Sequence, residues 1–104
     1  MRRGDVWWAE LPGPSGRRPV VLLTRNEAYA FRELVTVAPV TTYIRRIPTE
    51  VALGKKDGLP RQCVANLDTI TTIDKKALTA QLTSLMPEKL AALDRALKFA
   101  LGLR

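Results

Sequence analysis

The feature that most constrains the fold is a change in hydrophobic periodicity near residue 86. Beyond that point leucine recurs at spacings of three and four residues, at Leu90, Leu93, Leu97 and Leu101. This spacing places the leucines on one face of an amphipathic helix, which we expect over about residues 87–101. Pro87 suits the first position of this helix, and Gly102 suits its C-terminal stop.

Before the helix, short segments rich in β-branched and aromatic residues predict strands. These segments lie at residues 6–10, 20–24, 34–42, 49–53, 62–67, 69–73 and 78–85. Stretches dense in Gly and Pro at 11–16 and 54–60 predict loops, and Asn26 is expected to begin a short helical turn. Pro39 indicates an edge strand or a bulge. Short strands followed by one helix favour a mainly β fold with a C-terminal helix, in the form of a small β-barrel.

The chain length indicates one domain. Two separate hydrophobic cores do not fit into 104 residues, so we expect a single domain over residues 1–104, with the barrel at about 1–85. No apolar run approaches the roughly 18 residues that a membrane span needs, and no signal peptide is recognisable, so a cytoplasmic protein is predicted. The single cysteine, Cys63, excludes an internal disulfide and a cysteine-rich zinc site, and is expected to be a buried thiol.

The net charge of +7 favours a polyanionic partner. Residues 1–65 hold eleven basic and six acidic side chains, so most of the positive excess lies in the predicted barrel and not in the helix. Neutralising nucleic-acid phosphates releases counterions, which makes RNA or DNA a natural partner. The alternative is that the charge only keeps the protein from aggregating.

Histidine is absent, and this restricts the chemistry. The commonest proton-transfer group near neutral pH and the commonest nitrogen ligand for metals are both missing. No Gly-rich phosphate loop is present, and Asp68 and Asp74 are separated by a predicted strand, a poor arrangement for sharing an ion. We therefore expect neither a metal nor another cofactor.

Arginine and hydroxyl residues at predicted strand ends are the remaining candidates. Arg18 leads from a loop into a strand, where its guanidinium could bind a phosphate bidentately; the alternative is a solvated or structural arginine. Thr41 and Thr42 end a strand and could donate to phosphate oxygens, although threonine also simply favours β-structure. RNA would need little machinery, because its own 2′-hydroxyl can attack the adjacent phosphorus. Asp68 is the candidate general base.

Five sequence motifs, in their order and spacing, resemble the MazF/PemK/Kid toxin family. They are RGDVW at 3–7, RPVVL at 18–22, VAPVTT at 37–42, IPTEV at 47–51 and NLDTITTID at 66–74. The leucine-patterned helix completes the resemblance, which covers nearly the whole chain. Each motif is weak alone, and their shared order makes the match specific.

The resemblance implies an SH3-like β-barrel homodimer, with the fold shared by MazF and CcdB. It implies a metal-independent endoribonuclease toxin that cleaves single-stranded RNA at short sequences to 2′,3′-cyclic phosphate and 5′-hydroxyl ends, and so arrests translation and growth. The residues matching the family's catalytic positions are Arg18, Thr41 and Asp68. Residues expected to bind RNA are Arg17, Arg25, Thr42, Arg45 and Arg46. An antitoxin with an acidic, flexible tail would complement the positive charge.

Two alternatives remain open from the sequence. One is a gyrase-poisoning toxin of the same fold; such toxins use a C-terminal tryptophan, whereas this chain ends at 101–104 without one. The other is an RNA-binding barrel without catalytic activity, in which Trp7 and Trp8 would stack on bases. Adjacent strand residues point to opposite faces, so at least one of these tryptophans is expected in the core or at a dimer interface.

Overall fold

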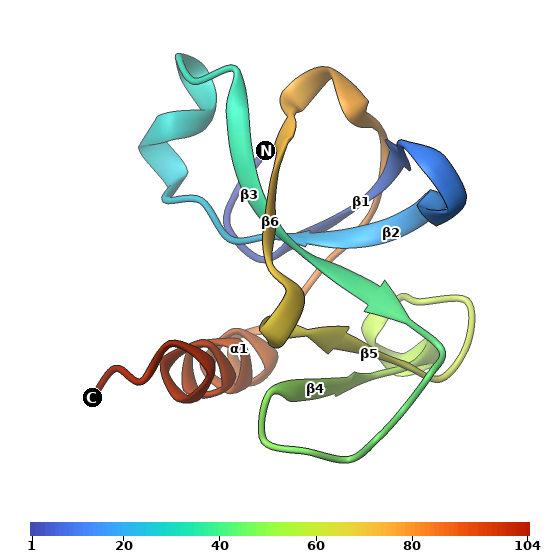
Figure 1. Ribbon diagram of the computed structural model, residues 1–104, viewed down its shortest axis with the longest axis vertical. Helices are drawn as coiled ribbons and strands as arrows, with labels where there is room; N and C mark the ends of the chain where they lie inside the picture. Colours follow the sequence, from blue (N-terminus) through green and yellow to red (C-terminus); the bar gives the residue numbers. More distant parts are fainter.

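Seven antiparallel strands and one C-terminal helix make up the computed structural model, which describes residues 1–104 (Figure 1). The elements are β1 (Asp5–Leu11), β2 (Gly16–Leu22), β3 (Leu34–Thr41), β4 (Glu50–Leu53), β5 (Cys63–Asn66), β6 (Thr71–Asp74), β7 (Leu78–Ser84) and α1 (Pro87–Leu101). A short 3-10 helix at Asn26–Ala30 confirms the helical turn expected there, but Asn26 does not cap it, because its Oδ1 accepts from the backbone N–H of Arg3 and the N-cap residue is Arg25. The predicted strand segments are all present, with β2 beginning four residues earlier than its apolar run indicated.

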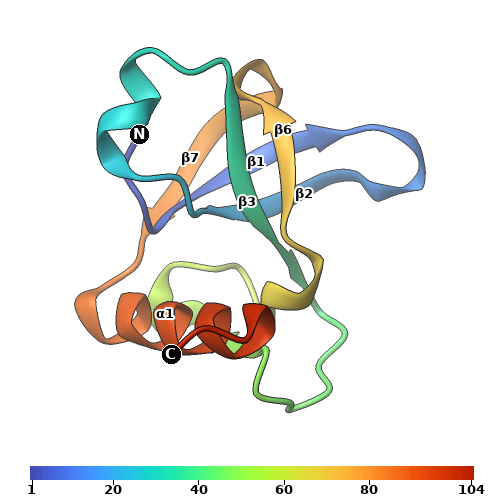
Figure 2. The same ribbon diagram turned by 60° about the vertical axis from the view of Figure 1, so that its left-hand side comes forward.

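The sheet has the strand order β4-β5-β3-β2-β1-β7, and β6 pairs with β3 (Figure 2). Strand β3 is therefore central, because it pairs with β2, β5 and β6. The sheet bends into a barrel-like form without closing, since β4 and β7 at its ends do not pair with each other. The prediction of a mainly β fold with a C-terminal helix is confirmed.

The helix α1 lies against one face of this curved sheet (Figure 2). It begins at Pro87, and Gly102 ends it in the left-handed conformation at φ 69°. Leu93 and Ala96 are buried, and Leu97 packs against the same hydrophobic cluster, so the leucine spacing did identify the core-facing side. No helix of the structure has the length and apolar character needed to cross a membrane.

Two hydrophobic clusters occupy the two faces of the β2–β3 pair. Val21 and Ala38 belong to the larger cluster, which α1 covers, whereas Val20, Leu22 and Val37 belong to the smaller one. Each of these five side chains is fully buried. The continuous apolar run of β2 is thus explained by burial on both faces.

Pro39 lies inside the central strand, which corrects the expectation of an edge or a bulge. It stands opposite Val20 of β2 in an uninterrupted register. On the other side of β3, pairing with β6 ends at Val37 and pairing with β5 begins at Val40. The residue without an N–H therefore coincides with a break between two partner strands, where no ladder bond has to be donated.

The glycine at position 58 shapes the connection between β4 and β5. Gly58 has φ +97°, and a Cβ there would lie 2.6 Å from the Cβ of Thr83.

We expect Gly58→Ala to lower the free energy of unfolding by about 2–4 kcal/mol, because alanine is strained in the left-handed conformation and its Cβ would clash with Thr83. Gly13→Ala is the matched control, because Gly13 has φ +66° but open space around it, and should cost only about 1 kcal/mol. Urea unfolding measures both; equal losses would contradict the role given to the contact with Thr83.

Candidate functional site

Arg18 and Thr41 lie on the neighbouring strands β2 and β3, each two residues beyond the last pair of the ladder that joins these strands. Val20 stands opposite Pro39 and Val21 opposite Ala38. The β2–β3 ladder ends at the Val20–Pro39 pair; beyond it, Arg18 pairs with Ala9 of β1 and Thr41 pairs with Val64 of β5. The two residues singled out by the sequence therefore lie on neighbouring strands, at the same end of the pair.

The guanidinium of Arg18 retains an unused donor. Its side chain is half-buried, and its Nε is fully buried without a hydrogen-bond partner. No carboxylate forms an ion pair with it. A buried donor left without a partner is energetically costly, so this arginine is a strong candidate for an anion-binding group.

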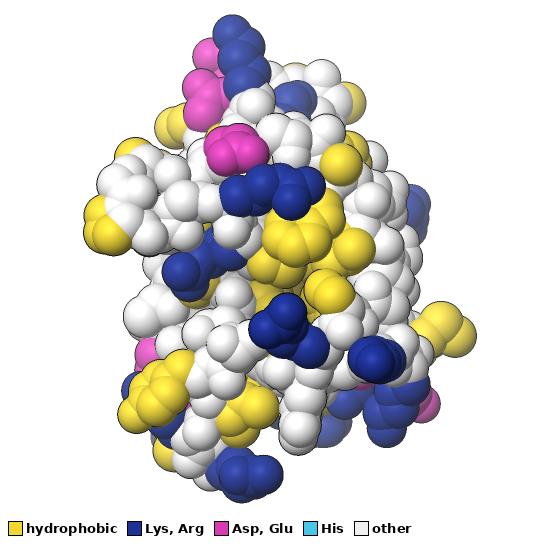
Figure 3. Space-filling view, turned by 90° about the vertical axis from the view of Figure 1, so that its right-hand side faces the viewer, with side chains coloured by type: hydrophobic (Ala, Val, Ile, Leu, Met, Phe, Trp, Pro, Cys, Tyr) yellow, Lys and Arg dark blue, Asp and Glu magenta, His cyan; other side chains and the backbone are white.

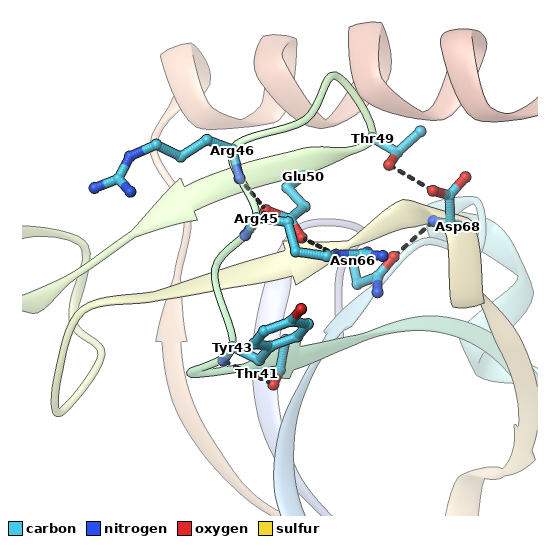
Figure 4. Close-up of polar contacts among 8 residues, drawn as sticks. All are labelled: Thr41, Tyr43, Arg45, Arg46, Thr49, Glu50, Asn66 and Asp68. Carbon is cyan, nitrogen blue, oxygen red and sulfur yellow. Dashed lines mark hydrogen bonds and ion pairs between the residues drawn. The ribbon is translucent and has the colours of Figure 1, made fainter.

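The hydroxyl of Thr41 is oriented by the chain that follows it. The backbone N–H of Tyr43 donates to Thr41 Oγ1 over 3.1 Å (Figure 4). This hydrogen bond uses an acceptor site of the oxygen and leaves the hydroxyl hydrogen available to donate elsewhere. A phosphate oxygen held by Arg18 would be a suitable acceptor.

A small pocket of about 210 Å³ opens beside Thr41. Its walls are formed by Trp8, Pro19, Thr41, Thr42, Pro60 and Arg61. Its floor is formed by buried side chains: Val40, Leu59 and Cys63. On this side of the molecule, an apolar area is bordered by Lys and Arg side chains (Figure 3). The pocket is thus apolar inside and basic at its rim.

Cys63 is the buried thiol that the sequence predicted. Burial raises the pKa of its thiol, and Asp57 contributes in the same direction. A thiol held protonated in this way is a poor nucleophile. Cys63 therefore contributes apolar surface to the pocket floor and no covalent chemistry.

The connection between Thr41 and β4 is held by one carboxylate, that of Glu50. Its Oε1 accepts from the backbone N–H groups of Arg45 at 2.9 Å and Arg46 at 3.0 Å, and its Oε2 accepts from Arg45 Nε at 2.9 Å (Figure 4). Burial of the carboxylate acts to raise its pKa, but these three hydrogen bonds outweigh that effect and hold the pKa of Glu50 below its ordinary value. Arg46 adopts φ 56°, a left-handed conformation that this clamp stabilises.

Asp68 lies in a part of the fold other than the ends of β2 and β3 that carry Arg18 and Thr41. It lies in a 3-10 turn beside α1, where its Oδ2 accepts from Thr49 Oγ1 over 2.6 Å (Figure 4). Its backbone N–H donates to Asn66 Oδ1. Thr41 pairs with Val64 of β5, which precedes Asp68 by four residues in the chain. Arg18 and Thr41 thus lie on neighbouring strands, whereas Asp68 lies in a turn beside α1.

The residues expected to bind RNA divide into two groups. Thr42 lines the pocket, Arg17 stacks its guanidinium 4.2 Å from the centre of the Trp8 ring, and Arg45 and Arg46 lie on the connection that follows Thr42. Arg25 follows the opposite end of β2, on the order of 20 Å of extended chain from Arg18, and its Nε lies 3.9 Å from a Glu27 carboxylate oxygen. Of these residues only Thr42 lines the pocket itself, and Arg17 contacts Trp8 of its wall.

Sequence reasoning missed Glu50 and Arg61. Glu50 occupies an alternating strand segment and looks like an ordinary exposed residue, although its side chain is only 2% exposed. Arg61 follows a Gly- and Pro-rich connection whose return to the end of β3 is a long-range event. Only the spacing of Arg45 and Arg46 from Glu50 offered a local signal.

Comparison with known proteins decides the family. Residues 2–101 match the model of the PemK-like, MazF-like toxins of type II toxin–antitoxin systems. The chain belongs to this family. A relative from Mycobacterium tuberculosis, the probable endoribonuclease MazF5, is 38% identical over 99 residues, which cover 94% of this chain and 90% of that protein.

Solved structures of toxins from the same family agree with this assignment. The M. tuberculosis toxin MazF-mt6 superimposes with a TM-score of 0.89 at 33% identity, covering 96% of this chain and 98% of that one. A mycobacterial endoribonuclease in complex with its cognate antitoxin also gives 0.89 at 33% identity, covering 100% and 97%. In the toxin described here, no group of three or more Cys, Asp or Glu side chains is arranged to hold a metal ion.

The Glu50 clamp yields a pH-dependent prediction. Because its folded pKa is lowered, the clamp stabilises the fold fully above the ordinary glutamate pKa and loses this contribution as the pH falls through the lower, folded value. We expect Glu50→Gln to cost about 1–3 kcal/mol at pH 7 and progressively less in acid. Glu27→Gln is the control, since that exposed pair should contribute under about 1 kcal/mol. A cost for Glu50→Gln that stays constant from pH 7 to pH 3 would contradict the ionised clamp.

Proposed function

We propose that this toxin is an endoribonuclease that cleaves single-stranded RNA at a phosphate bound between Arg18 and Thr41. The observations that support this most directly are the unpartnered guanidinium of Arg18 and the oriented hydroxyl of Thr41, which lie on neighbouring strands. The similarity to proteins named as endoribonucleases points in the same direction. We therefore prefer RNA cleavage to gyrase poisoning and to RNA binding without catalysis.

In the proposed reaction, the RNA supplies its own nucleophile. The 2′-oxygen attacks the adjacent phosphorus and gives up its proton to water. The bond from phosphorus to the 5′-oxygen breaks, and the 5′-oxygen takes up a proton from water. The products are a 2′,3′-cyclic phosphate and a 5′-hydroxyl. Arg18 neutralises the charge that builds up on the non-bridging oxygens, and Thr41 donates a hydrogen bond to one of them. We propose that neither a metal nor another cofactor takes part.

We propose that the basic residues around the pocket hold the RNA strand. Arg17, Thr42, Arg45 and Arg46 lie within reach of the chain on either side of the cleaved phosphate, and the net charge of +7 attracts it from solution. The same surface is complementary to an acidic, flexible tail of an antitoxin. We further propose a homodimer that acts in the cytoplasm, where RNA is accessible.

The central role of Arg18 is directly testable. We expect Arg18→Ala to lower the single-turnover cleavage rate of single-stranded RNA by about 10²–10³-fold, because it removes the main donor to the transition state. Arg95→Ala, which removes an exposed charge on α1, should change the rate by less than about threefold.

The assay for Arg18 is run in excess EDTA, with the matching DNA as a second substrate. RNA-specific cleavage supports the proposed function. Binding without cleavage would instead identify a non-catalytic RNA-binding barrel, and gyrase arrest without cleavage would identify a gyrase poison. A fully active Arg18→Ala protein would remove this residue from the site.

Asp68 receives a separate test, because it was expected to take part in proton transfer. From its position beside α1, we expect Asp68→Asn to reduce the cleavage rate by less than about tenfold, well below the 10²–10⁴-fold that losing a general base typically costs. The pH–rate profile is the second measurement. A loss as large as that of Arg18→Ala, with a missing ionisation in the profile, would assign the general base to Asp68 after all.

A further inference from the structure

The pocket beside Thr41 combines three properties that restrict what it can bind. Its volume of about 210 Å³ holds a single ring system and excludes a large ligand. Its floor is apolar and buried, and Trp8 forms part of its wall. No carboxylate lines it. The occupant therefore has a flat apolar face and groups that accept hydrogen bonds from the rim.

The rim of the pocket carries the guanidinium of Arg61, which can only donate hydrogen bonds. Arg61 is exposed and makes no hydrogen bond or ion pair within the chain, so its guanidinium is available. The one hydroxyl hydrogen of Thr41 is donated to the phosphate oxygen in the proposed reaction, so Arg61 is the donor that remains for the base. A guanidinium only donates, and it pairs with carbonyl or ring-nitrogen acceptors on a base edge. On the edge where guanine and uracil carry a carbonyl oxygen, adenine and cytosine carry an amino group, which would place a donor against the guanidinium donors.

We propose that this pocket binds one nucleobase of the RNA next to the cleaved phosphate, and that Trp8 and Arg61 select a keto base there, uracil or guanine. The proposal rests on the proposed ribonuclease function, since Thr41 belongs both to the pocket wall and to the phosphate site. Trp8 supplies the stacking surface, which accepts any base. Arg61 reads the edge of the base and so determines the sequence that is cut.

The face of Trp8 is already covered in the free protein. The guanidinium of Arg17 lies 4.2 Å from the centre of the ring, and its Nε is 3.7 Å from a Glu10 carboxylate oxygen. Both contacts are exposed and weak, and base–aromatic stacking is stronger than an exposed cation–π contact. Arg17 is not among the residues that line the pocket, so a base can enter the pocket without displacing this guanidinium.

The test compares cleavage of a random-sequence RNA pool by wild type and by Arg61→Ala, Trp8→Leu and Arg95→Ala, with sequencing of the cut ends. Wild type should show uracil or guanine enriched at one position next to the cut. Arg61→Ala should reduce that preference by about tenfold or more while still cutting RNA. Trp8→Leu should raise KM more than it lowers kcat, and Arg95→Ala should leave the profile unchanged. Adenine or cytosine at both neighbouring positions, or an unaltered profile in Arg61→Ala, overturns the proposal.

Fluorescence gives a second readout that needs no cleavage. In Trp7→Phe protein, Trp8 is the only tryptophan, and a 2′-deoxy oligonucleotide that cannot be cut should quench its emission when it carries the selected base. Trp8→Phe protein, which keeps only Trp7, should respond far less. Quenching by an acidic, aromatic peptide but not by the oligonucleotide would make the pocket a protein-docking site and overturn the assignment. If wild type cuts no RNA at all, the ribonuclease function itself fails, which is a different result from an altered or unaltered profile.

Discussion

The structure depends most on the antiparallel pairing of β2 with β3. Both faces of this pair are buried, so Val20 and Val21 belong to different hydrophobic clusters. A slip of one residue would send every side chain of β2 to the wrong cluster, which makes the register strongly determined. Arg18 and Thr41 lie on these two strands, each two residues beyond the last paired position.

Some polar side chains near the site form hydrogen bonds within the protein, and others have no partner in it. Glu50 commits its carboxylate to the chain that follows Thr41, and Asp68 is bound by Thr49. Arg18 Nε has no partner within the protein, and Arg61 makes no polar contact either. The unused groups are all donors. Such a surface binds anions, in agreement with the positive charge of the whole chain.

Local patterns predicted the elements well, and long-range pairing accounts for what they missed. Leucine spacing located α1, and the apolar run after Pro19 identified a strand buried on both faces. The break in pairing that accommodates Pro39 depends on β5 and β6, which no local pattern reveals. The family resemblance supplied Arg18 and Thr41 as a pair, and the structure places them on neighbouring strands. Arg61 could not be found because the folding of its segment against Trp8 is a tertiary contact.

The central claim is that Arg18 and Thr41 act on the same phosphate. A double-mutant cycle of Arg18→Ala and Thr41→Val, measured as single-turnover cleavage rates on one RNA, tests it most directly. Residues that act as a unit are strongly non-additive, so the double variant should be slower than the slower single variant by less than about threefold. If the two losses instead multiply in full, the residues act independently, and the shared phosphate site is contradicted.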